Sequence, residues 1–177
     1  MRKFELSSEK KDGLFRIRSL IDIPGTSIRK GTMGGLVENE SNLSHDGSCW
    51  IYDNARVFRN AVVKDDVKVF GYASIFDDAE VSGTGFVFSY AKVYGKTKIS
   101  GNVWVAMESN VFGDCFISGD SKVYFNISSG THTSIVVDNK TISYSGSDKN
   151  GLDYITIDSQ YKQISKKNLS ELFQKDF

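Results

Sequence analysis

A six-residue rhythm of hydrophobic and polar positions runs from Cys49 to Asn126. Read in sixes from Cys49, the first position is usually small, the third is always Ile or Val, and the fifth and sixth are mostly Gly, Asp, Asn or Ser. Alternate side chains of a strand point to one face, so the first and third positions share a face. A fixed six-residue period predicts a parallel β-helix. The third positions are Ile51, Val57, Val63, Val69, Ile75, Val81, Val87, Val93, Ile99, Val105, Val111, Ile117 and Val123.

Each six-residue unit is expected to form one wall of a coil. The β-branched third residue suits a packed, pleated surface, and the Gly, Asp or Asn that follows tolerates the backbone angles of a turn. Three walls close one coil, so positions eighteen residues apart stack at roughly 4.8 Å. The repeat therefore predicts an all-β fold with about four stacked coils that share one core.

The aliphatic residue with a small residue two places before it resembles the hexapeptide-repeat left-handed parallel β-helix family over residues 49–126. The left-handedness is implied by this resemblance. The preceding order Phe-Arg-Ile-Arg, Asp-Ile-Pro-Gly, Lys-Gly-x-x-Gly-Gly-Leu-Val-Glu and Cys-Trp-Ile-Tyr resembles a phage- or prophage-borne subgroup. Members of that subgroup are often labelled transferases without a proven activity, so the resemblance implies a mobile-element origin.

The remainder of the chain departs from the six-residue rule on both sides. Residues 1–48 are expected to form an N-terminal strand, centred on Phe15–Arg18, and a cap over the open end of the coils. Within them, Arg29–Val37 combines glycines with basic residues; this could cradle a phosphate, but we favour a capping loop. Residues 127–177 are expected to form a small antiparallel meander and a short terminal helix that begins at Asn168.

The outward positions differ from wall to wall. One wall is densely aromatic, a second carries a single aromatic ladder, and the third is largely polar. Exposed aromatic surface of this extent needs a cover, either the terminal segments and a symmetry mate or a ligand. The aromatic wall carries Trp50, Tyr52, Lys68, Phe70, Phe86, Phe88, Trp104, Ala106, Lys122 and Tyr124, and the ladder is Phe58, Phe76, Tyr94 and Phe112.

The corner that follows the aromatic wall is the candidate ligand site. Tyr72, Tyr90 and Glu108 recur there in register, with Met107 at a position where glycine is usual. Stacked aromatic rings near a lysine can hold a base or another planar anionic ligand. The residues predicted to bind such a ligand are Lys68, Tyr72, Phe86, Phe88, Tyr90, Trp104 and Glu108.

The composition limits the classes of binding partner and the cellular compartment that we expect for this protein. The formal net charge is zero, which argues against a dedicated binder of nucleic-acid polymers. The two cysteines, Cys49 and Cys115, are predicted to lie on different walls several coils apart, which excludes a disulfide between them. No apolar run reaches membrane-spanning length and the N-terminus lacks a secretory signal, so we expect a cytoplasmic protein of the bacterial host.

Catalytic residues are scarce. The resemblance implies an acyl-CoA-dependent acyltransferase with a histidine as general base and acetyl-CoA as donor, yet the chain has only two histidines. His45 and His132 flank the coils, and either could meet a neighbouring subunit's wall. The family's zinc carbonic anhydrases use three histidines, so we expect no metal site and, outside the acyltransferase alternative, no cofactor.

Three hypotheses follow, and the one that we favour is that the protein is not an enzyme. The chain is a non-catalytic homo-oligomer, expected to be a trimer, that sequesters a small anionic nucleotide-like ligand or a host protein to counter host defence. Alternatively, it is a hexapeptide-family acyltransferase that uses His132 or His45. The third possibility is a structural component of a phage particle.

Overall fold

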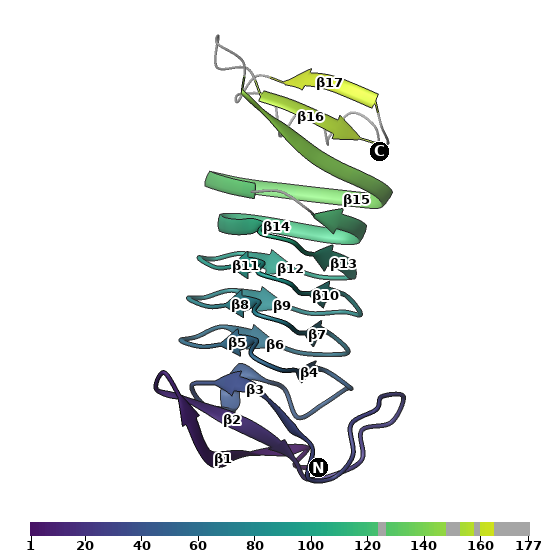
Figure 1. Ribbon diagram of the computed structural model, residues 1–177. Coiled ribbons are helices and arrows are strands. Elements are labelled where there is room, and N and C mark those ends of the chain that lie inside the picture. The colour runs from purple at the N-terminus through teal and green to yellow at the C-terminus, as the bar shows by residue number, and fades with distance from the viewer. Residues whose placement is uncertain (124–126, 148–152, 158–159, 165–177) are drawn as a thin grey trace.

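The computed structural model describes residues 1–123, 127–147, 153–157 and 160–164, and within these it shows a nearly all-β protein. Short parallel strands stack into a β-solenoid of about five turns (Figure 1), which confirms the predicted fold class and adds about one turn to the expected four. The described part contains a single helical turn, the 3-10 helix η1 (Glu40–Asn42). The expected terminal helix at Asn168 lies outside the described residues.

An N-terminal antiparallel sheet covers one end of the solenoid. Strand β1 (Phe4–Lys11) pairs with β2 (Leu14–Ser19), and β2 pairs with β3 (Met33–Val37). Strand β3 also runs parallel to β5 (Arg56–Val57), which joins this sheet to the first coil (Figure 1). The predicted strand at Phe15–Arg18 is thereby confirmed as part of β2.

The glycine-rich segment that could have cradled a phosphate is instead the buried strand β3. A Cβ on Gly34 would lie 2.7 Å from the carbonyl oxygen of Ile51, and one on Gly35 would lie 2.4 Å from Cγ2 of Ile51. Such approaches leave no room for a side chain. The glycines therefore allow β3 to pack directly on the first coil, in agreement with the capping interpretation.

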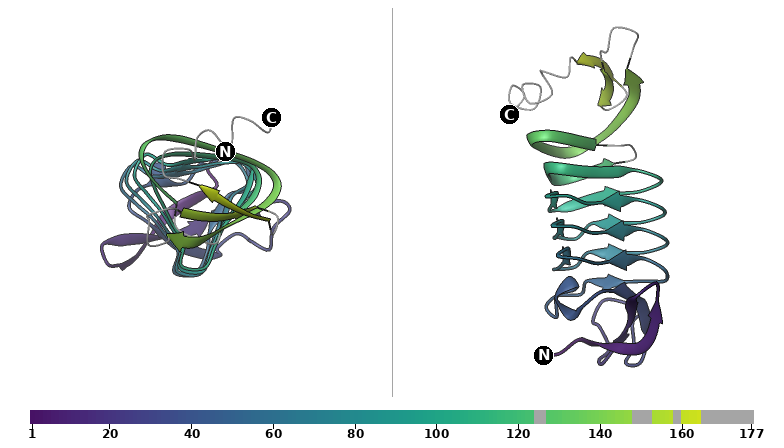
Figure 2. Two further views of the ribbon diagram at one scale, coloured as in Figure 1. Left: turned by 90° about the horizontal axis from the view of Figure 1, so that it is seen from above. Right: turned by 90° about the vertical axis from the view of Figure 1, so that its left-hand side faces the viewer.

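Three walls of parallel strands form the solenoid, and Figure 2 shows their coils from above and from the side. The aromatic wall contains β4 (Trp50–Ile51), β7 (Lys68–Val69), β10 (Phe86–Val87) and β13 (Asn102–Val105). The second wall contains β5, β8 (Ser74–Ile75) and β11 (Lys92–Val93). The third contains β6 (Val62–Val63), β9 (Glu80–Val81) and β12 (Lys98–Ile99). Every printed pair within a wall joins residues eighteen apart, such as Lys68 with Phe86.

The upper coils are longer strands that bend around several walls. Strand β14 (Asn110–Val123) pairs in turn with β11, β12 and β13. Strand β15 (Ile127–Ser147) then follows β14 in parallel as far as the pair Val123–Ile142. Only beyond that does the predicted antiparallel meander appear, with β16 (Asp153–Ile157) and β17 (Gln160–Ile164).

The six-residue sequence pattern stops before the solenoid itself ends, and this difference has a geometric cause. The partner of Val111 is Ile127, that of Ile117 is Ile135, and that of Val123 is Ile142, so the offset grows along β15. Two register shifts, between Gly113 and Cys115 and between Asp120 and Ser121, account for this growth. Bulges of this kind break the sequence period without breaking the pairing. Residues 127–147, which fall in the region expected to form the meander, are therefore one strand that continues the solenoid. The domain limits drawn from the repeat stay predictions.

The core is the interior of the coils. The inward residues from Cys49 to Val69 are fully buried, and Cys49 is a free thiol, as the predicted absence of a disulfide requires. Within the described residues, no helix is both long and apolar enough to cross a bilayer.

Neighbouring valines on β6 provide a test of which positions face inward. Val63 is fully buried in the third wall, whereas Val62 faces outward and is half-buried. We expect Val63→Ala to lower the free energy of unfolding by about 2 kcal/mol, because it leaves a cavity in the core. Val62→Ala should cost less than about 0.7 kcal/mol. Urea denaturation of both variants measures the difference, and equal losses would contradict the inward assignment.

Candidate functional site

The structure brings three of the predicted ligand residues together at one corner of the solenoid. Tyr72 and Tyr90 lie on successive coils with their rings parallel to within 4° and their centroids 5.2 Å apart. Their exposed fractions are 56% and 58%, which makes them the two most exposed aromatic side chains in the described part of the chain. Glu108 occupies the same position one coil further on and is also exposed.

A hollow of about 320 Å³ lies against this corner, lined by Tyr72, Tyr90, Lys92, Glu108 and Asn110. Lys92 and Asn110 belong to the second wall, where they are the first outward residues after the turn. Sequence reasoning placed both in the second wall and left them out of the site, because it treated each wall separately. Their positions two residues after Tyr90 and Glu108 were the available signal, since the turn between two walls places the end of one beside the start of the next.

The backbone at this corner adopts a left-handed conformation on successive coils. Asp53, Gly71, Ser89 and Met107 all have positive φ, between 52° and 71°. At Met107 this costs roughly 1 kcal/mol relative to glycine, because a Cβ crowds the following carbonyl. Met107 is also 59% exposed. The corner therefore presents an apolar, strained residue beside the hollow, where a glycine would be the ordinary choice.

The other predicted aromatics form a separate cluster on the face of the aromatic wall. Trp104 packs edge-on against Phe86 at 5.0 Å and against Phe88 at 6.3 Å, and Phe88 stacks on Phe70 at 4.9 Å. The ammonium of Lys122 lies 5.1 Å from the Trp104 ring centroid. These half-buried rings mostly contact each other, which leaves the Tyr72–Tyr90 corner as the more accessible stacking surface.

Lys68 is not available as the cation of the site. Its ammonium donates to the carbonyl oxygen of Ser48 at 2.6 Å, to the Ser48 hydroxyl at 2.9 Å and to the carbonyl oxygen of Asp66 at 3.0 Å. Burial lowers the pKa of Lys68, and the nearby Asp66 carboxylate opposes that effect. Lys92 is exposed and lines the hollow, so it replaces Lys68 as the candidate cation of the site.

The aromatic ladder of the second wall forms as expected. Phe58, Phe76, Tyr94 and Phe112 stack with centroids 4.8–5.1 Å apart and interplanar angles of 4–7°. All four are half-buried. The ladder therefore stabilises the wall through ring contacts, and it supplies a chemically matched reference for the tyrosines at the corner.

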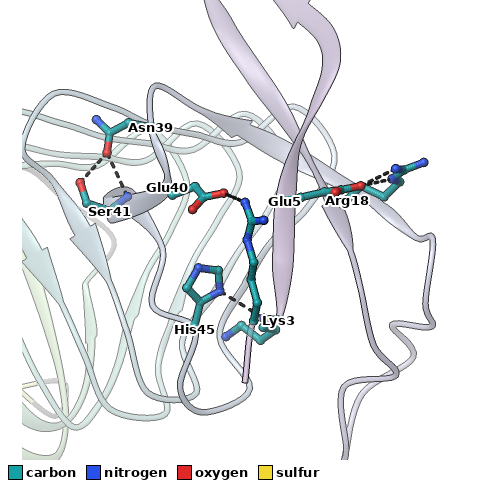
Figure 3. Close-up of polar contacts among 8 residues, drawn as sticks. Lys3, Glu5, Arg18, Asn39, Glu40, Ser41 and His45 are labelled. Atoms are coloured by element: carbon teal, nitrogen blue, oxygen red, sulfur yellow. Dashed lines mark hydrogen bonds and ion pairs between the residues drawn. The ribbon is translucent and has the colours of Figure 1, made fainter.

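His45 lies beside Lys3 and contacts its backbone (Figure 3). Its Nδ1 accepts a hydrogen bond from the backbone N–H of Lys3 at 3.2 Å, and its ring stacks on Phe4 at 4.4 Å. Burial lowers the pKa of His45 below 6.5, although Glu40 acts in the opposite direction. Because the unprotonated Nδ1 is already engaged, the neutral ring carries its proton on Nε2 and has no free lone pair for a substrate proton.

A buried lysine closes the same end. The Lys3 side chain is 2% exposed, and its ammonium donates to the carbonyl oxygens of Asp46 and Gly47 at 3.2 Å each. The same nitrogen lies 3.2 Å from Sγ of Cys49, whose pKa is raised by burial against the lowering effect of Lys3. These bonds satisfy the ammonium within the fold.

His132 and the possible metal ligands are the remaining candidates for catalysis or metal binding. His132 belongs to β15, and its side chain lies outside the described part of the structure. Among the described residues, no group of three or more His, Cys, Asp or Glu side chains is arranged to hold a metal ion. The homotrimer, the host-protein partner and the phage origin stay predictions.

Comparison with known proteins finds a relative that is named as an acetyltransferase. Over 82 residues the chain is 35% identical to the "Uncharacterized acetyltransferase YdcK" of Escherichia coli strain K12. The match covers 40% of this chain and 25% of that protein, so it spans about a quarter of the relative's length. A search of protein-family models finds no match. Together, the β-solenoid and this relative fit a hexapeptide-repeat transferase family.

The environment of His45 predicts a pH dependence of stability. Its folded-state pKa lies below the unfolded value near 6.5, so protonation opposes folding. The stabilisation is complete above about pH 6.5 and declines as the pH falls toward the folded-state pKa. Urea denaturation between about pH 7.5 and 5.5 should show a smaller decline for His45→Asn than for the unsubstituted protein.

NMR titration of the imidazole ring gives an independent measurement of the same group. The two histidine signals can be assigned with the His132→Asn variant, which retains His45. A His45 pKa at or above 6.5 would contradict the burial argument.

Proposed function

We propose that this protein binds a small anionic ligand with a planar ring at the Tyr72–Tyr90 corner. The observation that carries the proposal is the pair of parallel tyrosine rings, more than half exposed, beside a hollow of about 320 Å³. Pockets for small ligands occupy roughly 300–1,000 Å³, so this hollow suits a ligand the size of one nucleotide. Stacking on exposed tyrosines is a common way of holding such a ring.

The Lys92 ammonium supports an anionic group on the ligand, although Glu108 balances its charge in the same hollow. Lys92 lines the hollow and forms no ion pair within the described part of the chain, whereas Lys64 is paired with Glu80 and Arg59 with Asp77. An unpaired ammonium at the edge of a stacking surface can bind a phosphate or another anion. Because the chain as a whole is neutral, this attraction is local.

The biological role that we propose is sequestration. A solenoid that stacks a nucleotide-like molecule would remove it from solution, and the resemblance of the leader to phage-borne proteins supports a role in countering host defence. Association into a homotrimer through the aromatic faces would repeat the site around the assembly. A host protein is the alternative partner for the same surfaces.

Paired tyrosine variants test the site. Isothermal titration calorimetry with ribonucleotides, cyclic nucleotides and acetyl-CoA should show binding that Tyr90→Ala weakens about 5- to 100-fold, because it removes a stacking surface worth roughly 1–3 kcal/mol. Tyr94→Ala is the matched control, since Tyr94 also stacks in a ladder but lies outside the hollow. Equal losses in both variants would contradict the corner site, and silence from every ligand would favour a protein partner.

A second candidate function, acetyl transfer, is favoured by the relative named as an acetyltransferase. Acetyl-CoA carries an adenine nucleotide, so the same corner could hold its ring while its thioester extends along the solenoid. A general base is then required, and the engagement of His45 by the Lys3 backbone leaves His132 as the candidate histidine.

A measurement of catalytic turnover distinguishes acetyl transfer from sequestration. If the chain is an acetyltransferase, release of free CoA from acetyl-CoA should depend on an added amine or hydroxyl acceptor. His132→Ala should then reduce the rate about 10²- to 10⁴-fold, whereas His45→Ala should leave most of it. Binding of acetyl-CoA without any acceptor-dependent release would count against catalysis and leave the binding proposal intact.

A further inference from the structure

The corner column changes its chemistry between one coil and the next. At positions eighteen residues apart it carries Asn54, Tyr72, Tyr90 and then Glu108. The ring of Tyr72 covers one face of the Tyr90 ring, because the two are parallel and 5.2 Å apart. The other face of Tyr90 is turned toward the next coil, where Glu108 replaces the third ring that would have continued the stack.

This break in the column sets the height at which a ligand would lie. Successive coils are separated by about 4.8 Å, and stacked aromatic rings lie about 3.5–4 Å apart. A planar ring placed on Tyr90 would therefore lie close to the level of Glu108. Since Glu108 and Tyr90 line one hollow, the carboxylate would meet the edge of the ligand ring rather than its face.

The charged side chains of the hollow form no ion pair with the other described residues. Elsewhere, opposite charges on adjacent coils form ion pairs, as Lys64 does with Glu80. Lys92 and Glu108 line the same hollow, yet neither forms an ion pair within the described residues. A ligand that brings hydrogen-bond donors to Glu108 and a negative charge to Lys92 would satisfy both.

Nucleobases differ in what they offer to a carboxylate. Two carboxylate oxygens accept two parallel hydrogen bonds from adjacent N–H groups. Guanine presents adjacent ring and exocyclic N–H donors on its Watson–Crick edge. Adenine and cytosine place a ring-nitrogen acceptor beside their amino group, and uracil places its N–H between two carbonyl oxygens. Only guanine matches a carboxylate at both oxygens.

We infer that the ligand class of this corner is a guanine nucleotide, with its base on Tyr90, its Watson–Crick edge on Glu108 and its phosphate on Lys92. This inference rests on the proposed binding function and adds the identity of the base. It also assigns Glu108 as the specificity-determining residue and Lys92 as the phosphate contact.

Calorimetry with GMP, IMP and AMP tests the assignment, because IMP lacks only the exocyclic amino group of GMP. GMP should bind about tenfold more tightly than IMP and about a hundredfold more tightly than AMP, since each lost bond to a charged group weakens binding about 10- to 100-fold. Glu108→Gln should remove most of this preference and leave the affinity for AMP within about threefold. Glu80→Gln is the matched control, because Glu80 lies on the third wall away from the hollow.

The phosphate contact has its own readout. Lys92→Gln should weaken the binding of GMP about tenfold. It should leave the affinity for guanosine, which has no phosphate, unchanged within about twofold. Because Lys92 and Glu108 are exposed, thermal unfolding of the variants should match that of the unsubstituted chain.

The outcomes of these titrations distinguish guanine recognition from the proposed ligand binding on which it rests. Equal affinity for all three nucleotides, lost in Tyr90→Ala, would overturn guanine recognition and leave the binding site standing. A preference for GMP that survives Glu108→Gln would overturn the role of Glu108. No binding of any nucleotide would overturn both the inference and the nucleotide form of the proposed function.

Discussion

Repetition in register is the constraint on which this structure depends. Each coil donates backbone hydrogen bonds to the next at the same position, as Trp50 N–H does to the Val67 carbonyl at 3.1 Å and Lys68 N–H to the Gly85 carbonyl at 3.1 Å. Between Cys49 and Val123 every coil has the same length, because an inserted residue that is not absorbed by a bulge would turn inward side chains outward. The Ile or Val at the third position of each unit is buried inside the coil, and this burial keeps the length of each unit at six residues.

The same constraint determines what the surface can display. A residue on one coil is always stacked on its counterpart below, so like side chains form columns such as Phe58–Phe76–Tyr94–Phe112. A uniform column mainly stabilises the stack. Recognition needs a place where the column changes, and the step from Tyr90 to Glu108 is such a place beside a hollow. At the proposed site, the specificity would therefore come from a departure from the repeat rather than from the repeat itself.

The sequence predicts the interior better than the site, for physical reasons. The inward columns depend only on side-chain alternation within each unit, so Val57, Val63 and Val69 could be assigned directly. The continuation into β15 could not be found, because bulges conceal the period although pairing persists to Ile142. At the corner, Tyr72, Tyr90 and Glu108 share a column and were found, whereas Lys92 lies across a turn on the next wall. The engagement of Lys68 depends on the loop near Ser48, which has no repeat to indicate it.

The buried lysine at the start of the solenoid has a consequence for assembly. A stack of coils ends in a row of backbone groups that could accept another stack, and repeated addition at such an edge produces filaments. Here the Lys3 ammonium already occupies the carbonyl oxygens of Asp46 and Gly47, and its positive charge is held beneath them. A second chain approaching this end would have to displace a satisfied ammonium from a buried position. Together with the sheet of β1, β2 and β3 that covers this end, the Lys3 side chain disfavours end-to-end growth at the start of the solenoid.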